Sequence, residues 1–143
     1  MTKPIFILNG PNLNLLGTRE PEIYGSTTLE DIRAMCEAAA GARGQAVDFR
    51  QSNHEGDLID WVQEAGREGS AIIINAGGYT HTSVALHDAL RAVKLPVIEV
   101  HLSDPKTREP FRHISYIEPV AQQSICGKGA AGYVEALEAL AGS

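Results

Sequence analysis

Short apolar runs alternate with amphipathic segments along most of the chain. The apolar runs predict strands over residues 4–9, 70–75 and 96–101, and a shorter fifth strand over residues 123–126. Alternating apolar and polar residues predict a further strand over residues 46–50. Apolar residues at helical spacing predict helices over about 27–40, 55–68, 82–93 and 130–141. Thr27 and Glu30 stand at capping-box spacing where the first helix begins. The pattern therefore predicts a series of strand–helix units.

Such a series predicts a parallel sheet with helices on both faces. Because crossovers between parallel strands are right-handed, we expect a flavodoxin-like α/β fold, with a doubly wound five-stranded parallel sheet in three α/β/α layers. The 143 residues contain no repeat or linker, so we expect a single domain over residues 1–143. Ligands of these sheets bind beyond the carboxyl ends of the strands, so we expect the catalytic and binding residues in the loops that follow the strands.

Composition narrows the classes of function. The 12 Lys and Arg residues against 18 Asp and Glu give a net charge of −6, which argues against a nucleic-acid partner. No apolar stretch approaches the roughly 20 residues of a membrane span, and no secretion signal is evident, so we expect a cytoplasmic protein without a membrane partner. Cys36 and Cys126 match no metal or redox motif and are expected to be reduced structural thiols.

A long loop from Asn9 to Gly25 joins the first strand to the first helix. Loops of this length in α/β units are usually lids or binding loops, and this one carries Asn12, Arg19 and Tyr24. A nearby arginine lowers the pKa of a phenol because it stabilises the phenolate. The loop therefore predicts a tyrosine base activated by an arginine; a surface arginine beside a packed tyrosine is the alternative.

Glu99 and His101 form a second candidate pair, two residues apart on one predicted strand. Side chains at that spacing point to the same face of the strand. A carboxylate beside an imidazole fixes its tautomer and favours its protonated form, which suits a general acid. A structural ion pair at a strand end is the alternative.

The segment from Asn75 to His81 follows the most apolar strand. Asn75 and His81 offer hydrogen bonds to hydroxyls or a carboxylate. Gly77 and Gly78 allow the backbone to approach a ligand closely. Asp88 lies seven residues beyond His81, two turns along if both are helical. An ordinary strand exit is the alternative to a ligand-binding segment.

A basic segment follows the fourth strand. The backbone amides of Leu102 and Ser103 are available to a carboxylate, and the cations Lys106, Arg108, Arg112 and His113 cluster after them. This grouping on an acidic protein predicts a carboxylate or phosphate site, with a solvated loop as the alternative. His81 and His87 lack the spacing of zinc ligands and have no cysteine partner, so we predict no metal site.

Four motifs carry a resemblance to a known family. They are Asn9-Gly-Pro-Asn-Leu-Asn with Gly17-Thr-Arg-Glu-Pro and Tyr24-Gly25; Gln51-Ser-Asn-His-Glu-Gly56; Asn75-Ala-Gly-Gly-Tyr-Thr-His81; and Glu99-Val-His-Leu-Ser103 with Arg108 to Arg112. In this order, over about residues 5–140, the chain closely resembles the type II 3-dehydroquinate dehydratases, or type II dehydroquinases.

The resemblance implies dehydration of 3-dehydroquinate to 3-dehydroshikimate through an enolate, with no metal or organic cofactor. It implies that Tyr24 accepts the proton from C2 and that Arg19 lowers the pKa of this phenol. Asn12 would stabilise the enolate through a water. His101, oriented by Glu99, would protonate the departing C1 hydroxyl.

The resemblance also implies how the substrate is bound and how subunits assemble. Asn75, Leu102 and Ser103 would hold the carboxylate, while His81, Asp88 and Arg112 would bind ring hydroxyls. Family members form trimers that assemble into dodecamers, and an acidic residue matching Asp88 comes from a neighbouring subunit. We therefore expect a homo-oligomer.

Two departures from the family pattern stand out. Asp104 replaces the asparagine usual after His-Leu-Ser and adds a negative charge near an anion site. Glu118 and the segment Gln122–Ser124 replace a commoner Ser-Pro and Gly-containing pattern around the fifth strand. Neither departure touches the expected base or acid.

Other classes of function are open on the residues alone. A flavin- or nucleotide-binding module would use the first loop to cradle a phosphate with Ser, Thr and Gly, whereas this loop is rich in Asn and Leu. A phosphoacceptor domain would carry an aspartate where Asn75 stands. A purely structural oligomer would leave Arg19, Tyr24 and His101 unexplained.

Overall fold

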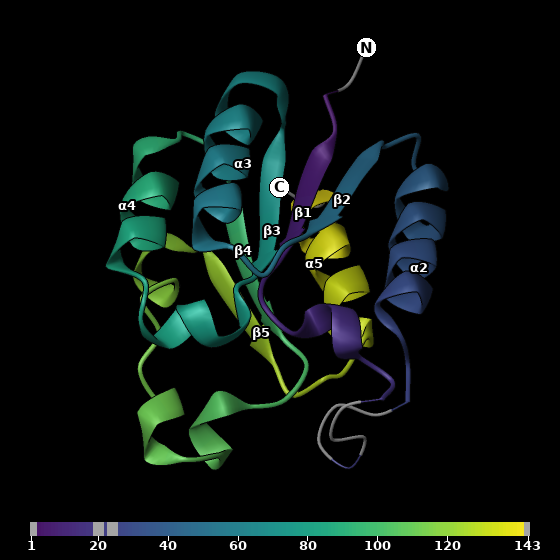
Figure 1. The fold of residues 1–143 in the computed structure, drawn as a ribbon. Helices are drawn as coiled ribbons and strands as arrows, with labels where there is room; N and C mark the ends of the chain where they lie inside the picture. The colour runs from purple at the N-terminus through teal and green to yellow at the C-terminus, as the bar shows by residue number, and fades with distance from the viewer. Residues whose placement is uncertain (1–2, 19–21, 23–25, 142–143) are drawn as a thin grey trace.

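Five parallel strands form the central sheet (Figure 1): β1 (Ile5–Asn9), β2 (Val47–Gln51), β3 (Ala71–Asn75), β4 (Val97–His101) and β5 (Gln123–Cys126). Their spatial order is β2-β1-β3-β4-β5. The α-helices are α2 (Leu29–Gly41), α3 (Glu55–Glu68), α4 (Val84–Ala92) and α5 (Ala131–Ala141). This computed structural model describes residues 3–18, 22 and 26–141. Among these residues, no helix is both long and apolar enough to cross a membrane.

Helices cover both faces of the sheet, α2 and α5 on one face and α3 and α4 on the other (Figure 1). Successive residues of a strand serve opposite faces. In β1, Ile5 and Ile7 pack with α2 and α5, whereas Phe6 and Leu8 pack with α3 and α4. Strands buried on both faces need apolar residues at every position, which explains the continuous apolar runs. The predicted flavodoxin-like, doubly wound, three-layer fold is confirmed.

The predicted elements are all present, with bounds within two residues of those observed. The predicted capping box at Thr27 is wrong by one residue. Thr28 Oγ accepts a hydrogen bond from Asp31 N at 3.1 Å, and the Asp31 carboxylate accepts one from Thr28 N at 3.0 Å. Two overlapping pairs in this segment have the same spacing, so spacing alone does not choose between them.

The loops that leave β1 and β3 pack against each other. Gly10 N donates a hydrogen bond to Asn75 O at 2.8 Å, and a Cβ at Gly10 would lie 2.3 Å from the carbonyl oxygen of Ala76. Gly77 has a φ of +59°, and a Cβ there would lie 3.0 Å from the carbonyl oxygen of Pro11. The contact of the two backbones therefore requires glycine at both positions.

The first half of the long loop is anchored in the core. Leu13 and Leu16 are buried in the cluster beneath α2 and α5, and Leu13–Leu15 form a short 3₁₀ helix. Asn12 precedes this helix with a φ of 69°, a left-handed conformation that asparagine tolerates better than most residues. The loop thus holds Asn12 at a defined position beside the end of β3.

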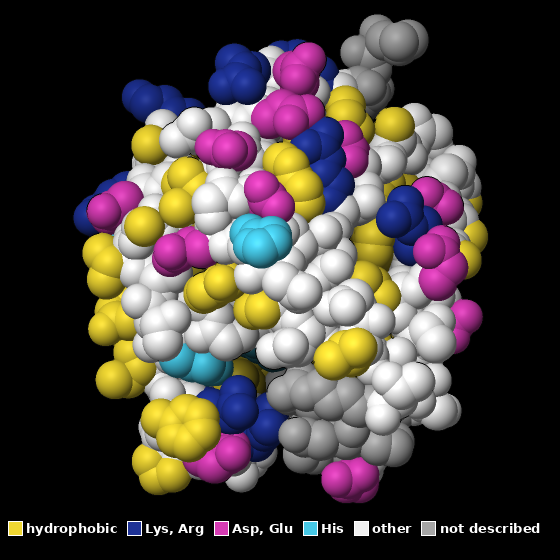
Figure 2. All heavy atoms as spheres, viewed as in Figure 1, with side chains coloured by type: hydrophobic (Ala, Val, Ile, Leu, Met, Phe, Trp, Pro, Cys, Tyr) yellow, Lys and Arg dark blue, Asp and Glu magenta, His cyan; other side chains and the backbone are white. Residues whose placement is uncertain are grey.

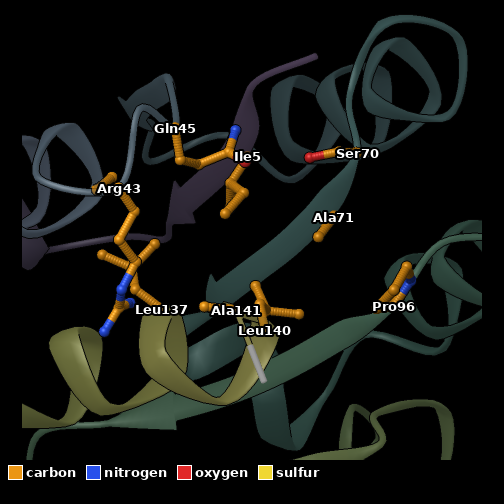
Figure 3. A pocket seen from close by; sticks show the side chains of 10 residues that line it. Ile5, Arg43, Gln45, Ser70, Ala71, Pro96, Leu137, Leu140 and Ala141 are labelled. Atoms are coloured by element: carbon orange, nitrogen blue, oxygen red, sulfur yellow. The ribbon is translucent and has the colours of Figure 1, made fainter. Parts of the chain in front are cut away.

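A cavity of about 530 Å³ opens at the edge of the sheet where the strands begin, opposite their carboxyl ends (Figure 3). Its walls are largely apolar, and its polar groups already have partners. Arg43 lies 3.7 Å from the Glu138 carboxylate, and Gln45 donates to the carbonyls of Lys3 and Ala46, at 3.0 Å each. No carboxylate, histidine or phenol lines it within the described part of the chain. The chemistry predicted from the sequence lies elsewhere.

Replacing Gly10 by alanine should destabilise the protein, because the new methyl group overlaps the Ala76 carbonyl and forces the two loops apart. We expect the free energy of unfolding, measured by urea denaturation, to fall by about 1–3 kcal/mol. Gly41→Ala is the matched control, because apart from its chain neighbours and the backbone of its own helix no described atom lies within 4 Å of the Cβ it would add. Equal stability of the Gly10 variant and the parent would contradict the contact.

Candidate active site

A cavity of about 160 Å³ lies at the carboxyl edge of the sheet, beyond the ends of β1, β3 and β4. Doubly wound sheets bind ligands where the strand order reverses, which here is between β1 and β3. The lining residues are Pro11, Asn12, Leu13, Asn75, Gly77, Gly78, His81, His101, Leu102, Ser103, Pro105, Arg108 and Arg112. Basic, acidic and histidine side chains gather at this end of the molecule, over the segment that follows β4 (Figure 2). Most predicted site residues therefore meet in one cavity.

Glu99 and His101 form a buried, hydrogen-bonded pair at the end of β4. His101 Nε2 lies 2.7 Å from Glu99 Oε2, and the two residues are 7% and 2% exposed. Ser115 Oγ donates to Glu99 Oε2 at 2.6 Å, and Ser124 Oγ donates to Glu99 Oε1 at 2.5 Å. A buried carboxylate needs such partners, because it has lost its water. The predicted orientation of the pair on one face of the strand is thus observed.

Burial raises the pKa of the Glu99 carboxyl, but hydrogen bonds from His101, Ser115 and Ser124 outweigh it, so this pKa lies below its usual value. Glu99 is therefore ionised near neutral pH and fixes the proton on Nε2 of His101. The second ring nitrogen, Nδ1, makes no hydrogen bond within the described residues, and the ring lines the cavity. This arrangement suits a histidine that donates a proton to a ligand.

His81 is held in one tautomer. Its Nδ1 lies 2.7 Å from the carbonyl oxygen of Ile114, and a carbonyl only accepts, so Nδ1 carries the proton. Burial, together with the positive charges of His101 and Arg112, lowers the pKa of His81 despite the opposing hydrogen bond to Ile114. The neutral ring leaves Nε2 as an acceptor, which suits a hydrogen bond from a ligand hydroxyl.

A tyrosine on α5 fixes the side-chain amide of Asn75. Tyr133 Oη accepts from Asn75 Nδ2 at 3.1 Å and donates to Asn9 Oδ1 at 2.6 Å. Asn75 Oδ1 accepts from Gly77 N at 3.3 Å. Burial raises the pKa of Tyr133, so its hydroxyl keeps the proton that it donates. The network sets the direction in which the Asn75 amide faces the cavity.

Asn12 is held through its backbone. Its N–H donates to Asn53 Oδ1 at 3.0 Å, and Gln51 Nε2 donates to the same oxygen at 3.1 Å. Tyr79 Oη donates to the backbone carbonyl of Asn53 at 2.9 Å. The end of β2 and the segments after β2 and β3 therefore stabilise the left-handed conformation of Asn12. Asn12 itself lines the cavity.

Arg108 and Arg112 bring positive charge to the cavity, next to Leu102 and Ser103. Arg112 Nε donates to Glu109 Oε1 at 2.9 Å, and Arg108 Nε lies 3.7 Å from the same oxygen. Glu109 thus orients both guanidinium groups. Paired arginines favour a carboxylate or another oxyanion as ligand.

Asp104, the charged departure from the family pattern, serves as a helix cap. Its Oδ1 accepts from Lys106 N at 3.0 Å, and the 3₁₀ helix Pro105–Thr107 follows it. Asp104 does not line the 160 Å³ cavity. Its carboxylate is therefore used locally rather than presented to an anion there.

Four predicted site residues are not placed in the 160 Å³ cavity. Glu99 lines an adjoining cavity together with His101. Asp88 is exposed on α4 and does not line it. Arg19 and Tyr24 lie outside the described residues, so the predicted activated tyrosine stays a prediction. Gly77 approaches Pro11 rather than serving only a ligand, whereas Gly78 faces open space.

Among the residues that the structure describes, neither a metal cluster nor a reactive thiol accompanies the site. The described part of the chain holds no group of three or more His, Cys, Asp or Glu residues that could bind a metal. Burial raises the pKa of Cys36 to about 12 and that of Cys126 to about 11, so both remain protonated at neutral pH. Their environment agrees with the prediction of structural thiols.

Several supporting residues escaped prediction from the sequence. Tyr133 has the pattern of a core aromatic residue in an apolar helix, and nothing in its neighbours marks its hydroxyl. Ser115 and Ser124 reach Glu99 from segments whose positions depend on the pairing of β5 with β4. The register of that pairing is the signal that would have identified Ser124.

A cavity at the strand ends, a carboxylate–histidine pair and two arginines are together typical of a flavodoxin-like α/β enzyme, with a site that suits an oxyanion. The sequence profile of the family Dehydroquinase class II matches residues 3–141, and the chain belongs to this family. It is thus a type II dehydroquinase family enzyme, a hydro-lyase, as the sequence motifs predicted.

Named relatives and a solved structure agree with this placement. The chain is 61% identical over 139 residues to the 3-dehydroquinate dehydratase of Hyphomonas neptunium, covering 97% of this chain and 93% of that protein. It is 59% identical over 142 residues to that of Phenylobacterium zucineum, covering 99% and 98%. The crystal structure of type II dehydroquinase from Propionibacterium acnes matches with a TM-score of 0.95 at 39% identity, covering 100% of this chain and 99% of that one.

Tyr133→Phe should loosen Asn75 without opening a cavity, because only the hydroxyl is lost. Two buried hydrogen bonds disappear, so we expect the free energy of unfolding to fall by about 1–3 kcal/mol in chemical denaturation. Tyr116→Phe is the control, since the Tyr116 hydroxyl has no hydrogen bond within the described residues. Equal effects of the two changes would argue against the network.

The substitution Glu99→Gln should make the free energy of unfolding less dependent on pH in the acidic range. The pKa of Glu99 lies below its ordinary value of 4.5, so ionised Glu99 stabilises the folded state. That contribution is fully present above the unfolded value and is lost as pH falls through the folded pKa. Denaturation between about pH 3 and pH 7 should therefore show a smaller loss of stability in the variant. An unchanged pH dependence would refute this account of Glu99.

Proposed function

We propose that this chain is a 3-dehydroquinate dehydratase that converts 3-dehydroquinate to 3-dehydroshikimate and water through an enolate. Two relatives that bear this name align with nearly the whole chain. The observation that carries the proposal is the buried Glu99–His101 pair beside a cavity with paired arginines. The reaction would serve aromatic amino acid biosynthesis through the shikimate pathway, or the breakdown of quinate.

His101 acts as the general acid in this proposal. The reaction breaks the C1–O and C2–H bonds and forms a double bond between C1 and C2, and the hydroxyl leaves as water once protonated. Glu99 fixes one ring nitrogen of His101 and balances the charge of the imidazolium, so the other nitrogen faces the departing oxygen. The elimination is redox-neutral, and the proposal assigns its two proton transfers to side chains of the protein.

The base is assigned through the family resemblance. Tyr24 would take the proton from C2, and Arg19 would hold this phenol in its ionised form. Asn12 would stabilise the enolate oxygen through a water. The fixed backbone of Asn12 supports this role, because it sets the residue at the cavity between the ends of β1 and β3.

The substrate carboxylate would be held by Asn75, Leu102 and Ser103, which all line the cavity. His81 and Arg112 would bind ring hydroxyls: neutral His81 accepts a hydrogen bond through Nε2, and Arg112 donates. The amide of Asn75 is already oriented by Tyr133, so it is set before the substrate arrives.

A neighbouring subunit would supply Asp88. This residue is exposed on α4 and lies away from the cavity of its own chain, so it reaches a substrate only from another copy. We therefore propose a trimer as the smallest complete unit and a dodecamer as the full assembly, located in the cytoplasm. Sedimentation equilibrium tests the assembly, and an active monomer would reject the shared site.

His101→Ala and Tyr24→Phe should each reduce turnover at least about a hundredfold, because each removes one of the two proton-transfer groups. The assay adds 3-dehydroquinate and follows the absorbance of the enone in the product. His54→Asn is the control: His54 is exposed at the start of α3 and does not line the cavity. Parent protein that folds and assembles but forms no enone would refute the function, and near-normal rates in either variant would refute that residue's role.

A further inference from the structure

Ser124 lies directly opposite Glu99 on the neighbouring strand. β4 and β5 pair in parallel with these two residues in register, and Ser124 Oγ donates to Glu99 Oε1 at 2.5 Å. The other carboxylate oxygen, Oε2, accepts from His101 Nε2 at 2.7 Å and from Ser115 Oγ at 2.6 Å. Within the described residues, Ser124 is thus the sole hydrogen-bond donor to Oε1.

We propose that Ser124 is a positioning residue that sets how readily His101 gives up its proton, acting through Oε1 of Glu99. A hydrogen bond to Oε1 draws negative charge away from the carboxylate. Less charge then remains to stabilise the imidazolium of His101, which becomes the stronger acid. The catalytic consequence rests on the proposed function, whereas the effect on His101 rests on the geometry.

The two serines differ in what else they hold. The side chain of Ser124 bonds only Glu99 within the described residues. Ser115 Oγ also accepts from the backbone N–H groups of Ile117 and Glu118, at 3.2 and 3.0 Å, so it fixes a turn as well. A change at Ser124 therefore alters the carboxylate without releasing a loop.

Other charged groups face the pair and are the same in every Ser124 variant. A cavity of about 260 Å³ adjoins the pair and is lined by Glu99, His101, Ser115 and Ser124. The titratable groups around the pair, in this cavity and in the 160 Å³ cavity, are His81, Asp104, Lys106, Arg108, Arg112, His113, Glu118 and Cys126. The adjoining space is large enough for water, which would replace the hydroxyl in an alanine variant.

Ser124→Thr and Ser124→Val form the matched pair that avoids this replacement. They have nearly the same shape and both suit a strand, but only threonine keeps the donor. We measure the titration of the His101 ring by NMR in ligand-free protein with ¹³C-labelled histidine, the signal being assigned by its loss in His101→Asn. His101 should keep its proton to higher pH in Ser124→Val than in Ser124→Thr, by about half a pH unit or more.

Kinetics give the second readout. The alkaline limb of the kcat profile, where the acid loses its proton, should move to higher pH by the same amount in Ser124→Val. The plateau of kcat should fall about two- to fivefold with KM within about twofold, because a weaker acid protonates the leaving group more slowly. Ser124→Thr should follow the parent, and so should Gln123→Ala, a change at an exposed position on β5.

Equal titration of His101 in the threonine and valine variants would overturn the inference, even if both variants are less stable than the parent. A titration shift with an unmoved alkaline limb would overturn the catalytic role. A titration shift in protein that never dehydrates 3-dehydroquinate, parent included, would support the effect on His101 and reject the proposed function instead.

Discussion

The parallel pairing of β1, β3 and β4 is the constraint on which the site depends. Asn9 is in register with Asn75, and Ile74 is in register with Glu99, so the three strands end side by side. Parallel strands deliver all their carboxyl ends to one edge, and segments distant in sequence become neighbours there. The cavity lies between the loops that leave this edge, and the backbone contact at Gly10 keeps two of those loops together.

The polar groups at this edge serve the fold and the site at once. Asn9 and Asn75 are buried and share the hydroxyl of Tyr133, and buried Glu99 accepts hydrogen bonds from a histidine and two serines. Buried polar groups without partners destabilise a protein, so these bonds are needed for folding. The same bonds fix the direction of each amide and ring before a ligand arrives, which is what catalysis requires of a site.

Sequence patterns predicted the features that depend on residues close together along the chain. The central strands β1, β3 and β4 were predictable because burial on both faces makes them largely apolar. Glu99 and His101 were predictable as a pair because they stand two positions apart on one strand. Contacts that depend on how the strands and helices pair in three dimensions could not be predicted from the sequence. Ser124 reaches Glu99 only through the pairing of β5 with β4, and Tyr133 joins Asn75 from a distant helix. Asp104 was expected to add negative charge near an anion site; it also caps a 3₁₀ helix, a role that its charge alone does not indicate.

We propose that the edge of the sheet holding Glu99 and His101 binds 3-dehydroquinate with its departing oxygen at His101. A crystal structure of the assembled protein with an unreactive analogue of 3-dehydroquinate tests this claim directly. We expect the C1 oxygen within about 3 Å of Nδ1 of His101 and the carboxylate beside Leu102 and Ser103. An analogue bound in the cavity where the strands begin, or one with its C1 oxygen turned away from His101, would contradict this claim.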